Sequence, residues 1–252
     1  MGNRLMGSIL AVVAMIAFSP VIFAQTAQRP GAATAQATTP TADLSGVWQI
    51  RNDPDGPQYS FTKTPLPLQP PAEYKYKYNN IKPEGDRSGK GRDELNPRGP
   101  FLCMPPGPTV LMLLETPFEI IQNPRRVIIH YQYDHLVRNI WMDGRKPPND
   151  PDPTFLGYSI GRWDGDTLVV DTTGINDKTW FDEAGTPHSD ALHVVERYRR
   201  IAHDTLEVGF QFDDPNTFTK PWGGAKKVYQ LLPNGEISEQ VACQELFKEK
   251  YF

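Results

Sequence analysis

Charged side chains share strand faces with apolar ones between residues 136 and 212. Because successive residues of a strand point to opposite faces, Arg138 lies on the same face as Ile140, and Glu196 and Asp171 fall on apolar faces of their own strands. Burial beside apolar residues raises the pKa of a carboxylate and a neighbouring arginine lowers it, so such groups can serve as general acids and bases. We therefore expect a pocket in which Asp171 or Glu196 accepts a proton and Arg138 stabilises an enolate, phenolate or carboxylate.

Three further side chains could complete an acid/base site. Tyr133 and Tyr158 are candidate proton donors, and His188, in a loop beside Ser189, is the imidazole placed most like a mobile catalyst. This set would serve a lyase, dehydratase or isomerase without a cofactor, and less readily a hydrolase. The alternative is an internal salt-bridge network around Arg138, because perturbed ion pairs in cores are often structural. The sequence leaves both interpretations open.

Aromatic side chains indicate what such a pocket would hold. Trp141, Trp163 and Trp180 offer surface on which a small apolar or aromatic molecule could stack. Tyrosines alternate with lysines between residues 74 and 78, on an edge strand or a short helix, and they could also line a pocket. These aromatic residues could equally belong to the core. A carrier or sensor that binds a small molecule without catalysis is therefore the alternative function.

A Ser-His-Asp hydrolase is a further variant, with Ser159 or Ser189 as nucleophile, His188 as base and Asp182 or Asp190 as its partner. Ser159 stands in the run Gly-Tyr-Ser-Ile-Gly, which has the letters of a nucleophile elbow. That elbow requires a turn from a strand into a helix. Because strands are expected on both sides of this run, we interpret the match as accidental.

Metal ions, nucleotide cofactors and nucleic acids are not expected as partners. The five histidines are scattered and form no His-Glu-x-x-His frame. Asp143, Asp150 and Asp152 could offer oxygens to Ca²⁺, but they lack the regular ligand spacing of a calcium hand. No glycine-rich phosphate loop opens a helix. The formal net charge of -4 disfavours a nucleic-acid surface, which needs an excess of clustered Lys and Arg.

Short alternating strands separated by turn residues make up most of the chain after residue 43. The run GRWDGDTLVVDTTG turns at Asp-Gly, a strong hairpin signal. About eight to ten such strands without helix-length apolar periodicity predict an all-β fold. We expect an antiparallel barrel, up-and-down or lipocalin-like, with a β-sandwich as the alternative. A long Pro/Gly-rich region precedes it, and the Pro-rich loop at residues 146–153 must cross an end of the sheet.

The N-terminus predicts export. Residues 1–24 have the plan of a signal peptide, with Arg4 before an apolar run and cleavage after Ala24. Residues 25–42 read as a disordered leader, and residues 43–252 as a single β domain. We therefore expect a periplasmic or extracellular protein with no membrane attachment after cleavage. In that oxidising compartment Cys103 and Cys243 are expected to form a disulfide, with two free thiols as the alternative.

Two resemblances add to this interpretation. Gly46-Val47-Trp48 resembles the Gly-x-Trp signature in the first strand of lipocalin-like (calycin) barrels, a family in which an arginine near the last strand packs over the tryptophan. From Cys103 to Cys243 the chain resembles a large group of secreted bacterial proteins without an established role. The shared features are PFEIIQ, DGR, GRWDGDTLVVDTTG, PHSDALHVVERYRR and the closing Cys. The first resemblance implies a barrel, and the second implies no catalytic residue.

Overall fold

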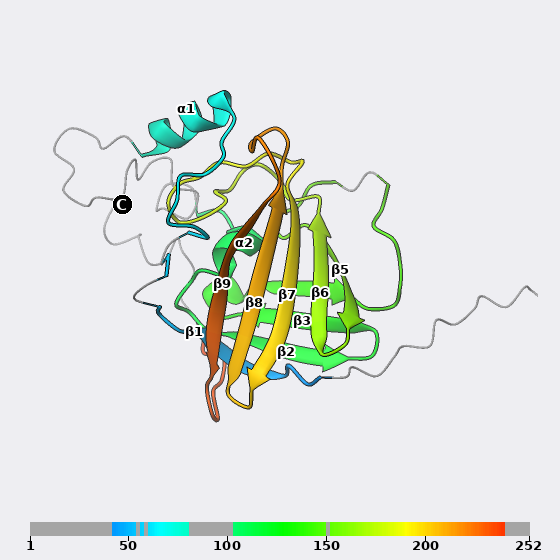
Figure 1. Cartoon of the computed structure of the whole chain (residues 1–252). Coiled ribbons are helices and arrows are strands. Elements are labelled where there is room, and N and C mark those ends of the chain that lie inside the picture. The colour runs from blue at the N-terminus through cyan, green and yellow to red at the C-terminus, as the bar shows by residue number, and fades with distance from the viewer. Residues whose placement is uncertain (1–41, 54–55, 58–59, 81–102, 150–151, 240–252) are drawn as a thin grey trace, which may run out of the picture. The chain divides into compact units, whose positions relative to one another are not determined.

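Nine strands close into a barrel in the computed structural model (Figure 1), which describes residues 42–53, 56–57, 60–80, 103–149 and 152–239. Each strand pairs with the next one along the chain, and the last pairs with the first. The predicted β-barrel is therefore confirmed. The strands are β1 (Gly46–Ile50), β2 (Phe118–Asn123), β3 (Arg126–Tyr131), β4 (Val137–Trp141), β5 (Tyr158–Asp164), β6 (Thr167–Thr173), β7 (His193–Ala202), β8 (Thr205–Asp213) and β9 (Trp222–Leu231).

Alternation along the strands decides which side chains fill the barrel. In β7 the buried residues include Val194, Glu196 and Tyr198, and in β4 they are Arg138 and Ile140. Each charged residue thus shares an inward face with apolar neighbours, because side chains two residues apart point the same way. The faces predicted for these two strands are confirmed.

One neighbouring pair, β4 and β5, runs parallel, whereas the other pairs are antiparallel. A tight hairpin reverses the chain, so a parallel pair needs a longer crossover connection. Residues 142–157 supply that connection, and they include the Pro-rich loop that we expected to cross an end of the sheet. The barrel is therefore mixed at this one place rather than antiparallel throughout.

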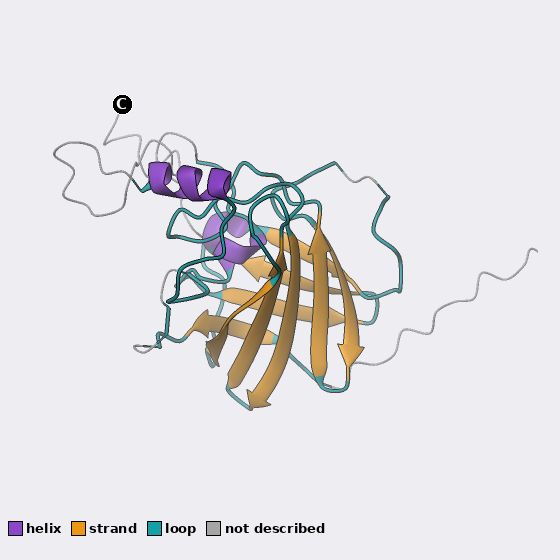
Figure 2. Cartoon of the chain, turned by 45° about the horizontal axis from the view of Figure 1, so that its top comes forward, coloured by secondary structure: helices purple, strands orange, loops and turns teal. Residues whose placement is uncertain are grey.

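Helices and long loops gather at one end of the barrel, here called the loop end (Figure 2). The helices are α1 (Pro70–Asn79) and α2 (Pro108–Leu111), with a 3₁₀ turn, η2 (Tyr133–His135), after β3. Both α1 and α2 begin with proline, whose missing N–H has no partner to lose in the first turn. The alternating tyrosines at residues 74–78 lie on α1, so the short helix is the interpretation that holds.

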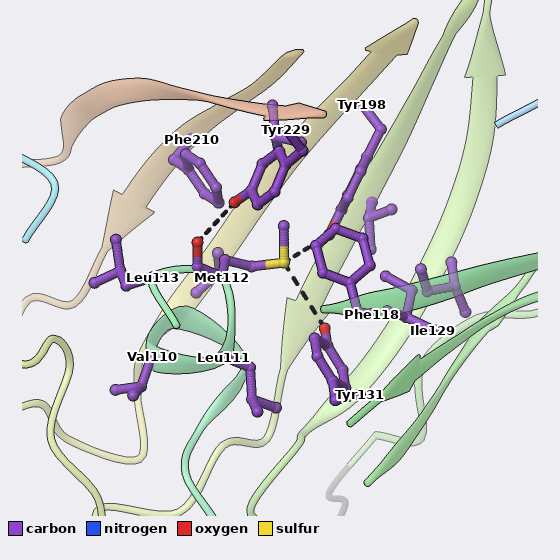
Figure 3. Packing of buried hydrophobic residues seen from close by; sticks show 14 of the residues in the cluster. Val110, Leu111, Met112, Leu113, Phe118, Ile129, Tyr131, Tyr198, Phe210 and Tyr229 are labelled. Atoms are coloured by element: carbon purple, nitrogen blue, oxygen red, sulfur yellow. Dashed lines mark hydrogen bonds between the residues drawn. The ribbon is translucent and has the colours of Figure 1, made fainter. Parts of the chain in front are cut away.

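The segment around α2 fills the inside of the barrel. Val110, Leu111, Met112 and Leu113 are all buried, and Figure 3 shows Met112 surrounded by side chains from the strands. The hydroxyl of Tyr229 donates a hydrogen bond to the Met112 carbonyl at 2.7 Å. The barrel interior is therefore a packed core at this level rather than an open cup.

An arginine covers the tryptophan of the first strand. The indole of Trp48 is fully buried and donates through Nε1 to the Leu44 carbonyl at 2.9 Å. Arg200, near the end of β7, places its Cζ 5.2 Å from the centre of that indole and donates to the Asp43 carbonyl at 3.0 Å. A guanidinium over an aromatic face is an attractive contact. This arginine lies on β7, whereas the lipocalin-like resemblance implies one near the last strand, which here is β9.

Some predictions fall outside the described residues. The predicted signal at residues 1–24, nearly all of the leader at 25–42, and Cys243 lie there, so export, the domain limits and the disulfide with Cys103 stay predictions. Within the described ranges, no helix has the length and apolar character to cross a bilayer.

Candidate functional site

Arg138 and Glu196 meet inside the barrel. Arg138 Nη1 lies 3.1 Å from Glu196 Oε1, and Nη2 pairs with Oε2, which makes the contact bidentate. The same guanidinium donates to Ser159 Oγ at 3.0 Å and to Thr172 Oγ1 at 2.8 Å. Such a fork-to-carboxylate pair is among the stronger polar interactions in proteins.

Two tyrosines complete this cluster. Tyr198 donates its hydroxyl hydrogen to Glu196 Oε1 at 2.7 Å, and the hydroxyls of Tyr131 and Tyr198 lie 3.8 and 3.7 Å from the sulfur of Met112 (Figure 3). Burial raises the pKa of Tyr131 to about 12 and that of Tyr198 well above its usual value. Burial alone would lower the pKa of Arg138, but the attraction of Glu196 and the tyrosines outweighs it and raises that pKa. Arg138 therefore stays protonated and the two tyrosines stay neutral at neutral pH.

The Arg138–Glu196 pair is enclosed by the protein. Each of the two side chains exposes 1% of its surface, and their hydrogen-bonding groups are occupied by partners from the protein. An internal salt-bridge network, the alternative that the sequence left open, matches this arrangement. The expected open pocket around Arg138 is not what the described residues form there.

Asp171 does not point into the barrel. Its side chain is 55% exposed and its Oδ1 lies 2.9 Å from His193 Nε2 on the outer surface. The prediction that Asp171 shares an inward face is therefore wrong. Val169 lies on the same outer side of β6 as Asp171 and is nevertheless buried. Its apolar side chain gave this outer face the pattern of a core face. Thr172 is the β6 residue that reaches the Arg138 cluster.

His188 is a fixed, buried residue rather than a mobile imidazole. Its Nδ1 lies 3.0 Å from the Ser189 carbonyl, and because a carbonyl can only accept, Nδ1 is the donor. In the neutral ring the other nitrogen, Nε2, then accepts a hydrogen bond from Thr179 Oγ1 at 3.0 Å. Burial lowers the pKa of His188. The Ser189 hydroxyl donates to Asp214 at 2.7 Å instead of to His188. The Ser-His-Asp arrangement weighed for a hydrolase is thus not assembled here.

The remaining predicted site residues are spread over the molecule. Tyr133 lies in η2 against the core, and Tyr158 begins β5. Trp141 lies under the guanidinium of Arg145, 3.9 Å from ring centre to Cζ, and Trp163 packs against the core. Trp180 is half-buried in the loop before β7. The structure does not bring the three tryptophans together as one ligand surface.

A different cavity lies at the loop end, with a volume of about 570 Å³. We call it the rim pocket. Its walls come from residues 60–68, from α1 and from residues 182–186. Asn79 Nδ2 donates to the Gly185 carbonyl and Asn80 Nδ2 to the Ala184 carbonyl, both at 2.9 Å, which holds α1 against the loop. The lining residues are Ser60, Thr62, Lys63, Thr64, Pro65, Leu66, Leu68, Glu73, Tyr76, Lys77, Asp182, Ala184 and Thr186.

Phe181 fixes the loop that carries the acidic residue of this pocket. Its ring is fully buried, with its centre 4.7 Å from that of Phe212 and 5.5 Å from those of Phe61 and Phe218. Its backbone N–H donates to the Thr186 carbonyl at 2.7 Å. The next residue in the chain is therefore anchored by an aromatic cluster rather than free to swing outward.

Asp182 is a buried carboxylate that is only half satisfied. Its Oδ1 accepts from the backbone N–H groups of Ala184 and Thr186, both at 3.1 Å. Its Oδ2 and the Thr186 hydroxyl are buried without a hydrogen-bond partner. Burial raises the pKa of Asp182 to about 6, although the N–H and the nearby hydroxyl of Thr186 and the N–H of Ala184 lower it. The Thr186 hydroxyl is thus near enough to favour the charged carboxylate, although it does not meet the geometry of a hydrogen bond to Oδ2.

The charges around Asp182 do not neutralise it. Lys77 pairs with Glu73 on the same helix, with Nζ 2.6 Å from Oε1. No described cation pairs with Asp182, and Glu183 raises its pKa further. The pKa of Tyr76 is raised by its burial and by the charge of Asp182, which places its hydroxyl within electrostatic reach of the carboxylate.

Sequence reasoning did not single out this pocket. It weighed Asp182 only as a triad partner and the tyrosines of residues 74–78 only as possible pocket residues. The one signal was an acidic residue directly after Phe181 in a long polar loop, a place where sites often lie. The described residues contain no group of three or more His, Cys, Asp or Glu side chains that could hold a metal ion. No protein-family model matches this chain, and no curated protein matches it.

Proposed function

We propose that this protein is a secreted β-barrel that binds a small molecule in the rim pocket, where Asp182 contacts the ligand. The observation that carries the proposal is Asp182 Oδ2, a buried carboxylate oxygen that lacks a donor beside a cavity of about 570 Å³. Leaving a buried charged acceptor without a partner costs about 1–3 kcal/mol or more, so proteins rarely keep one without a use. A donor on a ligand would remove that cost.

The ligand is a small molecule with an apolar part and a polar head. Leu66, Leu68 and the ring of Tyr76 provide apolar lining, while Asp182 and Thr186 provide the polar end. Concave sites with apolar walls and a few polar groups are the usual form of small-molecule sites. The apolar or aromatic ligand expected from the sequence therefore fits the rim pocket better than the filled barrel interior.

Acid/base catalysis at the same place is a second candidate function. A carboxyl group with a pKa of about 6 can both give and take a proton near neutral pH, which is what a general acid or base needs. Tyr76 is a second proton-bearing group in the pocket. The reaction would be of the lyase, dehydratase or isomerase type, with Asp182 in the role first given to Asp171 or Glu196.

The contact between Trp48 and Arg200 supports a lipocalin-like barrel, since an arginine also packs over the first-strand tryptophan in that family, although from a different strand. The predicted signal at residues 1–24 and the resemblance to secreted bacterial proteins support a periplasmic or extracellular location. A carrier, sensor or enzyme for small molecules would suit that location.

A fragment screen by ¹H–¹⁵N NMR tests the proposal. Binding compounds are expected to shift amide signals of residues 60–68 and 182–186. Asp182→Asn should weaken these compounds at least about tenfold, whereas Asp166→Asn, the same substitution outside the lining of the pocket, should change affinity less than about threefold. Hits that shift only residues elsewhere, or equal binding to Asp182→Asn, would refute the site. Following bound hits over hours for chemical change separates an enzyme from a carrier.

A further inference from the structure

We infer that the rim pocket recognises the ammonium group of a small amine. The inference rests on the proposed function, because it names the chemistry of the ligand for the same site. It depends on three features of the pocket: the unpaired polar atoms at its base, the charges around them and the walls beside them.

The unpaired polar atoms of the pocket are a carboxylate oxygen and a hydroxyl. Asp182 Oδ2 can only accept when the carboxylate is ionised, whereas the Thr186 hydroxyl can accept or donate. An ammonium group carries three donors and no acceptor, so one such head can donate to both oxygens. An alcohol can pair with both groups as well but brings no charge, and a carboxylate brings no donor for Oδ2. The hydrogen-bonding groups therefore exclude an anionic head, and the charge distinguishes an amine from an alcohol.

The charges point the same way. Asp182 carries a buried negative charge, and Tyr76 lies within electrostatic reach of it. The cations of the lining are Lys77, which is paired with Glu73, and Lys63, and neither pairs with Asp182. A hydrogen bond between two charged groups is roughly twice as strong as a neutral one. A cationic head would supply the missing counter-charge, whereas an anionic head would meet repulsion.

The walls favour a short hydrocarbon or aromatic body on that amine. Leu66 and Leu68 lie along one side of the lining, and the half-buried Tyr76 belongs to α1 on the other. Residue Asp182 itself exposes only 1% of its surface, so the ligand head must reach the base of the pocket. A compact primary amine satisfies this requirement better than a branched or quaternary one.

Three probes with the same phenyl body test the inference: phenethylamine, 2-phenylethanol and 3-phenylpropanoate. Their affinities for the full-length protein are measured by calorimetry and by amide shifts at pH 7.5. We expect phenethylamine to bind at least about tenfold more tightly than the other two. Asp182→Asn keeps the shape and the Oδ1 acceptor but removes the charge, so it should cancel this preference. Asp166→Asn, the same substitution at an exposed aspartate outside the lining of the rim pocket, is the control and should preserve it.

The pH dependence gives a second readout. Because the carboxyl of Asp182 has a pKa of about 6, its ionised fraction falls about tenfold between pH 7 and pH 5, and the affinity for phenethylamine should fall with it. Equal or stronger binding of the alcohol or the carboxylate would overturn the inference while leaving the site intact. An amine preference that persists in Asp182→Asn would also overturn it. If compounds of every class fail to shift the pocket residues, the proposed function itself falls.

Discussion

Replacing Asp182 by asparagine should stabilise the unliganded protein at neutral pH. Asparagine keeps an oxygen that can accept from the N–H groups of Ala184 and Thr186, and it removes a buried charge that has no cation beside it. Most substitutions of buried polar residues destabilise a fold. The opposite sign is expected here because the wild-type carboxylate is held in the structure at a cost.

The size of the effect follows from the shift of the pKa. A rise from the ordinary 3.8 to about 6 corresponds to about 3 kcal/mol at 1.36 kcal/mol per pKa unit. The folded state binds the proton of Asp182 more tightly than the unfolded state does. The contribution of this group to the free energy of unfolding is therefore greatest below pH 3.8 and is lost as the pH rises through about 6. The asparagine variant has no such loss.

Urea unfolding of both proteins at pH 4 and at pH 7.5 measures this. The free energy of unfolding of Asp182→Asn minus that of wild type should increase by up to about 3 kcal/mol from the lower pH to the higher one. Other titrating groups cancel in this double difference. Glu73→Gln controls for the loss of one negative charge at the loop end. A double difference near zero, or one of opposite sign, would refute the claim that the carboxylate is buried without compensation.

Three further outcomes are expected. Arg138→Met should lower the free energy of unfolding by about 3–5 kcal/mol in urea melts, because it leaves Glu196 buried without its cation, and adding Glu196→Leu should restore much of the loss; no recovery would contradict this. The free energy of unfolding of wild type should fall relative to that of His188→Gln as the pH drops below 6.5, because burial lowers the pKa of His188 and the folded state resists its protonation. A difference in urea melts that does not change with pH would argue against this. Gly157→Ala should cost more than Gly165→Ala in thermal melts, because both have positive φ (66° and 62°) but only at Gly157 would a Cβ meet other atoms, at 2.7 Å; equal costs would count against it.

The barrel and its charged centre follow from the sequence because they depend on local alternation. Hairpin turns at Asp-Gly and the period of two residues predict the strands, and the same period places Arg138 and Glu196 inside. Tyr198 could have been added to that cluster from the sequence, since it lies two residues from Glu196 on the same face. Asp171 was misplaced because Val169 is buried on the outside of the sheet, which a single strand's pattern cannot distinguish from the inside.

The rim pocket could not be predicted because it joins segments that are far apart in the chain. Residues of α1 and the loop at 182–186 meet through Asn79 and Asn80, more than a hundred positions away from their partners. No periodic pattern connects such loops. Filling of the barrel by Met112 also has no local signal, because a buried four-residue helix looks like any short apolar run.

The parallel pairing of β4 and β5 suggests a structural role for the buried charges. Only two residue pairs align β4 with β5, against nine between β7 and β8. The β4–β5 pairing is the shortest one in the barrel. Arg138 lies on β4 and donates hydrogen bonds to Ser159 on β5, Thr172 on β6 and Glu196 on β7. One side chain thus cross-links three successive strands to β4, beside the strand pair that has the fewest main-chain partners. The side-chain contacts of Arg138 therefore add to the main-chain pairing of the barrel at the place where that pairing is shortest.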